Sequence, residues 1–243
     1  MKYLFLEEID STNKFAKEHI SEMDNMTVVY TYNQTAGRGR LERKWTYLGD
    51  GNIYASIVIK PNTEMKPVYA NLTQLLSLVI AQTMEEYKVI PKIKWPNDVR
   101  IDGRKISGIL AESTVINENF TKKSIGIILG FGVNLNTDKK QLEKIDQAAT
   151  SLNIETGINI DKDFFLQKVL ERFYLLYNRF IEGGFSLIRE EYKKRAEFLN
   201  KEITVKVFDK LYEGRAVDIT EDGALKLVNK NKKEHILLIG DIL

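Results

Sequence analysis

Apolar and polar positions follow two different periods in the first part of the chain, which predicts a mixture of strands and helices. Runs of β-branched, apolar and aromatic residues predict strands at 3–6, 27–32 and 53–59. Asp10, Ser11 and Thr12 can cap a helix that runs to about residue 20. Pro67 opens a helix whose apolar positions recur at helical spacing, so we expect it to pack on a sheet.

The middle of the chain reads as strands and tight turns. Four strands are expected from apolar or β-branched runs bounded by turn residues: 92–95, 99–101, 105–112 and 124–133. The Asp102-Gly103 dipeptide is the strongest short hairpin signal in the chain. The last of the four runs is nearly all apolar, which is typical of a central strand. By contrast, the polar, Gly-rich and cationic stretch 34–52 predicts a loop.

The carboxyl-terminal part changes from helical spacing to a period of two. One helix carries the apolar positions from Phe165 to Phe180 and ends at Gly183-Gly184, and a second runs over about 187–199. Four short strands follow, which share alternating patterns: 203–208, 214–219, 224–228 and 235–239. So many short strands predict a small barrel, with a domain boundary near 196–201.

Composition narrows the possible chemistry of the 243-residue chain. An apolar share of 43% supports a sizeable core, and 36 Lys plus Arg against 34 Asp plus Glu argues against a dedicated nucleic-acid binder. The lack of Cys excludes disulfides, thiolate nucleophiles and Cys-ligated metals, and two His make a His-built metal site a poor candidate. Oxygen-ligated magnesium stays open. No signal peptide or membrane span is visible in the pattern, so we expect an intracellular protein.

Residues 37–45, Gly-Arg-Gly-Arg-Leu-Glu-Arg-Lys-Trp, concentrate four cations and one acid next to two glycines. Arginine forks suit phosphate and carboxylate, and glycine lets backbone amides approach a ligand. Trp45 offers a flat face for a base. The alternatives to a ligand-binding loop are a basic loop that is simply solvated and a loop that contacts RNA.

Two further segments combine a strand end with polar groups. In the sequence Lys94-Trp95-Pro96-Asn97-Asp98, Pro96 turns the chain, so Lys94 at the strand end can be aimed at a carboxylate and a phosphate. Asp98 could hold magnesium or orient a partner. An exposed lysine beside a half-buried Trp95 is the alternative.

Glycines within two predicted strands indicate that a ligand or another element comes close to the strand backbone. Gly108 weakens its strand unless a ligand or a packed helix needs the space. Gly130 and Gly132 end the most apolar strand, but the third glycine and following helix of a dinucleotide-binding fold are absent, so we reject that interpretation. Asn134 could read a purine edge through its amide. The segment Asp10–Lys14 is either a helix cap or a binding site for a small polar ring.

The order and spacing of these segments resemble the biotin–protein ligases, also called biotin–[acetyl-CoA-carboxylase] ligases. The resemblance covers nearly the whole chain and rests on five motifs in series, S-T-N, Q-x-x-G-R-G-R-x-x-R-x-W, K-W-P-N-D, K-x-x-G-I-L-x-E and G-x-G-x-N-x-N, and on Ala149-Thr150-Ser151-Leu152. It implies an α+β fold: a mixed β-sheet with helices packed on one side, similar to class II synthetases, over residues 1–196, then an SH3-like β-barrel over 197–243.

The resemblance also implies a two-step reaction. Biotin and ATP, with Mg²⁺, would give biotinyl-5′-AMP and pyrophosphate, and a lysine of a biotin carboxyl carrier domain would then take the biotinyl group. The protein is expected in the cytoplasm and without a membrane partner. Whether it forms a homodimer is left open. Only ten residues precede Ser11, which leaves no room for the DNA-binding domain of some members, so no DNA binding is expected.

The resemblance assigns site residues by position. The biotin pocket would be formed by Ser11, Thr12, Asn13, Gln34, Arg38, Gly39, Arg40, Lys94 and Gly108. The ATP site would be formed by Arg38, Arg40, Arg43, Trp45, Asn97, Lys105, Gly130, Gly132 and Asn134. Lys94 and Arg40 are the predicted catalytic residues, which stabilise charge on the phosphate oxygens. Asp98 is a guess for the base of the transfer step.

The loop departs from the common pattern, and two alternative functions were considered. Many members have Gly at the position of Glu42 and often a basic residue at that of Leu41, so the loop here is less cationic and less flexible. Lipoate or octanoate transfer on the same scaffold is the alternative function. An RNA-binding module is a third reading, but residues 201–243 carry eight Lys plus Arg and eight Asp plus Glu, a net charge of zero that gives no footprint for nucleic acid.

Overall fold

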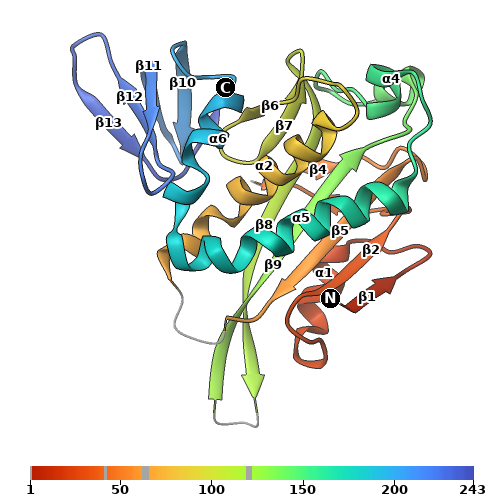
Figure 1. Cartoon of the computed structure of the whole chain (residues 1–243). Helices are drawn as coiled ribbons and strands as arrows, with labels where there is room; N and C mark the ends of the chain where they lie inside the picture. Colours follow the sequence, from red (N-terminus) through yellow and green to blue (C-terminus); the bar gives the residue numbers. More distant parts are fainter. Residues whose placement is uncertain (1, 41–42, 62–65, 119–121) are drawn as a thin grey trace. The chain divides into compact units, whose positions relative to one another are not determined.

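The strands predicted near the amino terminus pair into a mixed sheet in the computed structural model, which describes residues 2–40, 43–61, 66–118 and 122–243 (Figure 1). The chain divides into two units. The first unit consists of residues 1–66 and 104–166, and the second of residues 67–103 and 167–243.

The first unit holds most of the predicted strands. Its elements are β1 (Lys2–Phe5), α1 (Thr12–Glu18), the 3-10 helix η1 (Ile20–Glu22), β2 (Thr27–Thr31), β3 (Gly37–Arg38), β4 (Lys44–Trp45), β5 (Asn52–Ile59), β8 (Arg104–Glu118), β9 (Lys122–Asn134), α3 (Lys139–Leu142) and α4 (Leu152–Thr156). Within this unit the strand order is β1-β2-β5-β9-β8. The β1–β2 pair is parallel and the other pairs are antiparallel, so the prediction of a mixed sheet is confirmed.

Helix α1 packs on the face of this sheet formed by β5 and β9. Its Ala16 and the neighbouring Ile20 are buried against Val29, Val58 and Ile128. Val58 pairs with Ile128, and Val29 pairs with Ser56, two residues before Val58, so the alternation of β-strand side chains puts the last three on one face. The burial of these apolar side chains therefore holds the segment that begins at Ser11 against the sheet.

The stretch 34–52 is not a loop throughout. Strands β3 and β4 pair in antiparallel fashion, with Gly37 opposite Trp45 and Arg38 opposite Lys44. Leu41 and Glu42, the two departures from the family pattern, lie outside the described residues. The strands β8 and β9 are also longer than predicted, and their paired residues reach Glu118 and Lys122. Periodicity does not reveal this extension because its residues are mostly polar.

The second unit holds two strands, most of the helical residues and the carboxyl-terminal strands. Its elements are the 3-10 helix η3 (Pro67–Asn71), α2 (Leu72–Glu85), β6 (Lys92–Lys94), β7 (Asp98–Ile101), the greater part of α5 (Lys162–Gly183), the 3-10 helix η4 (Phe185–Leu187), α6 (Arg189–Arg195), β10 (Glu202–Val207), β11 (Lys210–Ile219), β12 (Leu225–Val228), β13 (Glu234–Leu237) and β14 (Asp241–Ile242). Helix α2 contacts β6, β7 and α6, so the predicted packing of this helix on strands is confirmed.

The carboxyl-terminal strands form an antiparallel sheet in the order β13-β12-β11-β10-β14. The four predicted strands are present, and the two-residue β14 is the one that the pattern missed. Residues 198–243 are all described, and among them no pairing between β13 and β14 closes the sheet into a barrel. Gly223, in the turn between β11 and β12, has a φ of 79°, a conformation that glycine adopts without strain because it has no Cβ.

Helix α5 confirms the predicted apolar face. Phe165, Val169, Phe173 and Phe180 are fully buried, whereas Leu175 on the other face is 74% exposed. None of the helices in the described ranges is long and apolar enough to cross a lipid bilayer.

We expect Phe173→Ala to lower the free energy of unfolding by about 3–5 kcal/mol, because the truncation removes a fully buried ring and leaves a cavity. Leu175→Ala, two residues away on the same helix, is the matched control and should change it by less than about 0.5 kcal/mol. Urea unfolding followed by circular dichroism measures both. Equal midpoints for the two variants would contradict the assignment of the buried face.

Candidate functional site

Three glycines leave neighbouring positions on one face of the sheet in the first unit without side chains. Gly108 of β8 pairs directly with Gly132 of β9, and Gly130 lies two residues earlier on the same face. A Cβ at Gly132 would lie 2.8 Å from the ring of Trp45, and one at Gly108 would lie 2.9 Å from it. A Cβ at Gly130 would overlap the amide of Asn13. These three residues, called the glycine floor below, therefore let Trp45 and Asn13 approach the strand backbone.

A chain of hydrogen bonds lies beside the glycine floor and is called the polar network below. Thr12 N–H donates to Gln34 Oε1 at 2.9 Å, and Thr12 Oγ1 lies 2.8 Å from Ser56 Oγ. Ser56 Oγ lies 2.6 Å from Asn13 Oδ1, and Asn13 Nδ2 donates to Glu112 Oε2 at 2.9 Å. All of these side chains except that of Glu112 are buried. Buried donors and acceptors in this number can recognise a polar ring.

The start of α1 positions two members of the polar network. Ser11 is the N-cap, and its Oγ accepts from Lys14 N–H at 3.4 Å. Lys14 Nζ donates to Asp10 Oδ2 at 2.6 Å. This hydrogen bond lowers the pKa of Asp10 and raises that of Lys14. The capped first turn thus presents Thr12 and Asn13 toward β5 and β9.

The described part of residues 37–45, called the Gly-Arg loop below, begins next to this network. A Cβ at Gly37 would lie 2.6 Å from Gln34 Nε2 and 2.9 Å from Trp45 Cβ. Gly39 N–H donates to Arg43 O at 2.7 Å, so a backbone hydrogen bond follows directly on the β3–β4 pairing. Arg38 and Arg43 are exposed, and Arg40 is half-buried. The loop therefore carries its cations at the surface beside buried polar groups.

Trp45 also borders predicted nucleotide-binding residues. Lys105 Nζ lies 5.5 Å from the centroid of the Trp45 ring, within the range of a cation–π contact. Trp45, Lys105 and Asn134 line a cavity of about 30 Å³. Asn134 is buried, and its Nδ2 donates to Thr150 O at 3.1 Å. A larger hollow of about 540 Å³, lined by residues that include Arg104 and Thr150, shares three lining residues with this cavity: Ile145, Gln147 and Ala149.

Burial also affects the tyrosine next to the glycine floor. Tyr54 of β5 pairs with Gly132 and is 1% exposed, so its phenol is removed from water and its pKa is raised. Its hydroxyl accepts from Asn52 Nδ2 at 3.4 Å. Tyr54 therefore stays neutral at physiological pH, and it shares the sheet face of Gly132.

The predicted site residues thus fall into two groups. The first unit brings together Thr12, Asn13 and Gln34 in the polar network, and Trp45, Lys105 and the glycine floor at its border. Lys94 and Asn97 belong to the second unit, where Lys94 pairs with Asp98 across the β6–β7 hairpin. Their participation in the site stays a prediction. No cluster of three or more acidic or His side chains suited to a metal occurs in the described part of the chain.

Sequence reasoning missed two members of the polar network, Ser56 and Glu112. Ser56 pairs with Gly130 and lies fully buried within the apolar run of β5. A signal was present, because a hydroxyl in a buried strand needs a hydrogen-bond partner. Glu112 closes the K-x-x-G-I-L-x-E motif and shares the face of Gly108, since it lies four residues further along β8.

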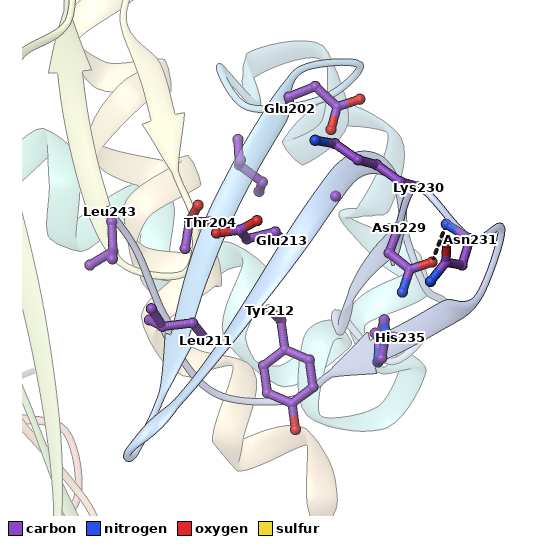
Figure 2. A pocket seen from close by; sticks show the side chains of 12 residues that line it. Glu202, Thr204, Leu211, Tyr212, Glu213, Asn229, Lys230, Asn231, His235 and Leu243 are labelled. Atoms are coloured by element: carbon purple, nitrogen blue, oxygen red, sulfur yellow. Dashed lines mark hydrogen bonds between the residues drawn. The ribbon is translucent and has the colours of Figure 1, made fainter.

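A separate hollow of about 960 Å³ lies on the carboxyl-terminal sheet, and no residue lining it was singled out from the sequence (Figure 2). The rings of Tyr212 and His235 meet edge to face there, with centroids 5.2 Å apart. Glu202, Glu213 and Lys230 also border the hollow. Acidic, basic and apolar side chains are mixed on this surface, so its electrostatics favour no single class of ligand.

Two family descriptions match the chain. Residues 5–134 match the biotin/lipoate A/B protein ligase family, and residues 198–243 match the biotin protein ligase C-terminal domain. The first match includes the polar network, the Gly-Arg loop and the glycine floor.

Curated relatives have similar sequences. The bifunctional ligase/repressor BirA of Bacillus subtilis is 29% identical over 222 residues, which are 90% of this chain and 67% of that protein. The biotin–[acetyl-CoA-carboxylase] ligase of Paracoccus denitrificans is 30% identical over 227 residues, 90% of both proteins. The chain thus spans about two thirds of the former relative and nearly all of the latter.

A solved structure of similar fold is the biotin protein ligase from Aquifex aeolicus in complex with biotin and ATP. It is 28% identical, with a TM-score of 0.84, and the match covers 100% of this chain and 97% of that one. A biotin protein ligase from Leishmania major in complex with biotinyl-5-AMP has the same fold at 20% identity and a TM-score of 0.65.

We expect Gly132→Ala to displace the ring of Trp45 from the glycine floor, because the new methyl group would lie 2.8 Å from ring atoms. Acrylamide should then quench the tryptophan fluorescence more strongly. Trp95 is 2% exposed, so the change reports Trp45. Gly183→Ala is the matched control, since the nearest atom to a Cβ there is 3.9 Å away. Quenching of Gly132→Ala equal to that of the wild type would show that Trp45 does not rest on this glycine.

Proposed function

Since the chain belongs to the biotin/lipoate A/B protein ligase family, we propose that it joins biotin to a lysine of a carrier protein through biotinyl-5′-AMP. It is a biotin protein ligase by its family match and by the matching carboxyl-terminal domain. The observation that carries the proposal is the buried polar network beside the glycine floor, in the unit that also holds the Gly-Arg loop.

The polar network favours biotin over lipoate and octanoate, the alternative acyl groups. The bicyclic ring of biotin carries a ureido group with two N–H donors and one carbonyl acceptor. The dithiolane of lipoate and the alkyl chain of octanoate have no such groups. A site that includes the buried polar groups of Thr12, Gln34, Ser56 and Asn13 offers hydrogen-bonding partners that a ureido ring can use and that neither of the latter can.

The first step we propose joins two anions. A carboxylate oxygen of biotin attacks the α-phosphorus of ATP, a new O–P bond forms, and the bond from that phosphorus to the bridging oxygen breaks, so pyrophosphate leaves. Lys94 and Arg40 are the proposed catalytic residues because fixed cations reduce the repulsion and stabilise charge on the phosphate oxygens. Mg²⁺ would arrive bound to the phosphates of ATP.

The residues around Trp45 are proposed to hold the nucleotide. Trp45 offers an aromatic face, and Lys105 provides a cation above its ring. Asn134 would lie near the adenine, and Asn97 would complete the site from the KWPND segment. Arg38 and Arg43 of the Gly-Arg loop would contact phosphates, and Gly39 would let the loop close over the reactive adenylate and exclude water.

In the second step the amine of a carrier lysine attacks the acyl carbonyl of biotinyl-AMP. An amide forms, the bond to the phosphate oxygen breaks, AMP leaves, and the amine gives up a proton. Asp98 is our candidate for the base.

The carrier we propose is a biotin carboxyl carrier domain, and the setting is the cytoplasm, where ATP and carboxylases are available. We further propose that residues 1–196 form the catalytic domain and that residues 197–243 form an SH3-like domain. A homodimer is the assembly to test.

The proposal is tested by pyrophosphate release from ATP and magnesium in the presence of biotin, lipoate or octanoate. Release should depend on biotin. Mass spectrometry should then detect one biotinyl group on a carrier domain added to the reaction. Turnover of lipoate equal to that of biotin would assign the chain to the other branch of the family.

We expect Lys94→Ala to lower the rate of biotin-dependent pyrophosphate release on the order of a hundredfold, as the loss of a preorganised charge contact does. Lys92→Ala is the matched control, because Lys92 lies on the same three-residue strand β6. It should keep a rate within about threefold of the wild type, the change expected at a surface position. A wild-type rate in Lys94→Ala would remove this lysine from the mechanism.

A further inference from the structure

The turn between β11 and β12 contacts the KWPND segment, residues 94–98, and the proposed mechanism gives this turn no role. Gly223 of the turn is buried, and its carbonyl oxygen accepts from Trp95 Nε1 at 3.3 Å. We propose that Gly223 is a positioning residue, which holds the ring of Trp95 and thereby fixes the place of the adjacent Lys94. This inference rests on the proposed function, because it takes Lys94 as a catalytic residue.

The first step is the rigidity of the turn. Gly223 N–H donates to Thr220 O at 2.9 Å, and Thr220 N–H donates to Ala224 O at 2.8 Å. Thr220 Oγ1 also accepts from Ala224 N–H at 3.0 Å. These hydrogen bonds close the turn on itself, so the carbonyl group of Gly223 has a fixed direction.

The second step is the contact of the turn with η3 and α2. Gln74 Nε2 donates to Gly223 O at 2.9 Å. Asn71 Nδ2 donates to Asp222 O at 3.0 Å and to Gln74 Oε1 at 2.6 Å, so the NH₂ group of Gln74 must face the turn. A Cβ at Gly223 would lie 2.4 Å from Asn71 Nδ2 and 3.1 Å from the ring of Phe185. The turn therefore fits this place only with glycine at position 223.

The third step leads from Gly223 to Lys94. Trp95 directly follows β6 and is 2% exposed, and its buried indole N–H needs the acceptor that Gly223 O supplies. Burial alternates along this stretch, since Ile93 and Trp95 are buried whereas Lys92 and Lys94 are half-buried. Successive strand residues face opposite sides. Fixing the indole on one side therefore fixes the direction in which Lys94 leaves the backbone on the other.

A second route of contacts connects the turn with the same segment. The ring of Phe185, which lies next to Gly223, meets the ring of Tyr192 edge to face, with centroids 5.5 Å apart. Tyr192 is fully buried, and its hydroxyl donates to Pro96 O at 3.4 Å. The backbone that carries Lys94 is thus held through Trp95 by a hydrogen bond and through Pro96 by two packed rings.

The experiment is a cycle of variants in the full chain, assayed by biotin-dependent pyrophosphate release at saturating biotin and ATP. Trp95→Phe removes the indole N–H and keeps an aromatic ring in the core. We expect it to lower the rate by about tenfold or more, because a small displacement of a catalytic group has effects of this size. In the Lys94→Ala background it should lower the rate by less than about twofold, since no charge is left to misplace.

A purely structural role of Trp95 gives a different result. A smaller fraction of folded enzyme, or a general distortion of the second unit, would lower the rate by the same factor in both backgrounds. The comparison between the two factors therefore distinguishes positioning of Lys94 from support of the fold.

Hydrogen exchange followed by mass spectrometry tests the contact without reference to activity. Gly223→Ala should speed the exchange of amides in residues 92–101 by about tenfold, because the displaced turn leaves the indole N–H without its acceptor. Gly184→Ala is the matched control, since Gly184 has a φ of 74° and no atom lies within 4 Å of a Cβ there. It has the same backbone strain without the clash, so exchange in 92–101 should stay at the wild-type rate. Trp95→Phe, which should give the same faster exchange, carries this test if Gly223→Ala does not fold.

The outcomes separate this inference from the proposed function. A wild-type rate in Trp95→Phe, or an equal loss in both backgrounds, overturns the inference. Exchange in 92–101 that is unchanged in Gly223→Ala, or equally fast in Gly184→Ala, also overturns it. By contrast, absence of biotin-dependent pyrophosphate release from the wild type overturns the proposed function, and a wild-type rate in Lys94→Ala overturns the role of the lysine on which the inference rests.

Discussion

Close packing against bare strand backbone is the constraint on which the site in the first unit depends. Trp45 and Asn13 occupy the volume that a Cβ atom would need at positions 108, 130 and 132, where the chain has Gly108, Gly130 and Gly132. A protein interior is packed so densely that even one methyl group in this volume requires a neighbour to move. The same face lets two hydroxyls and two amides gather close to the sheet, and their mutual hydrogen bonds offset the loss of water.

Most of the fold follows from local patterns. The amphipathic face of α5 and the alternation of β5 are visible in the sequence because burial against a core repeats with the geometry of the element. The Asp102-Gly103 turn is also visible, since both residues have positive φ. The β3–β4 hairpin and β14 were not predicted, because strands of two residues have no period and depend on tertiary contacts.

The motifs of the candidate site could be predicted from the sequence, but the hydrogen bonds between its residues could not. Glycines and cations stand out in the sequence, and the family resemblance assigns them roles. Ser56 carried only a general signal, a hydroxyl in an apolar strand that needs a partner, and its place in the site follows only from the register that sets it opposite Gly130. Glu112 was quoted as part of a motif, but its partner Asn13 is distant in sequence, and no spacing rule connects them. The positions of Lys94 and Asn97 in the site stay predictions.

The antiparallel pairing of Gly108 with Gly132 has a consequence for how this protein family can change length. Adding or deleting one residue in β8 or β9 near these glycines would turn every neighbouring side chain to the opposite face, and Ile109 and Phe131 would fill the space under Trp45. Insertions and deletions are therefore tolerable here only as compensated pairs. Natural variation in chain length should collect in the connecting turns and leave the strand core unaltered.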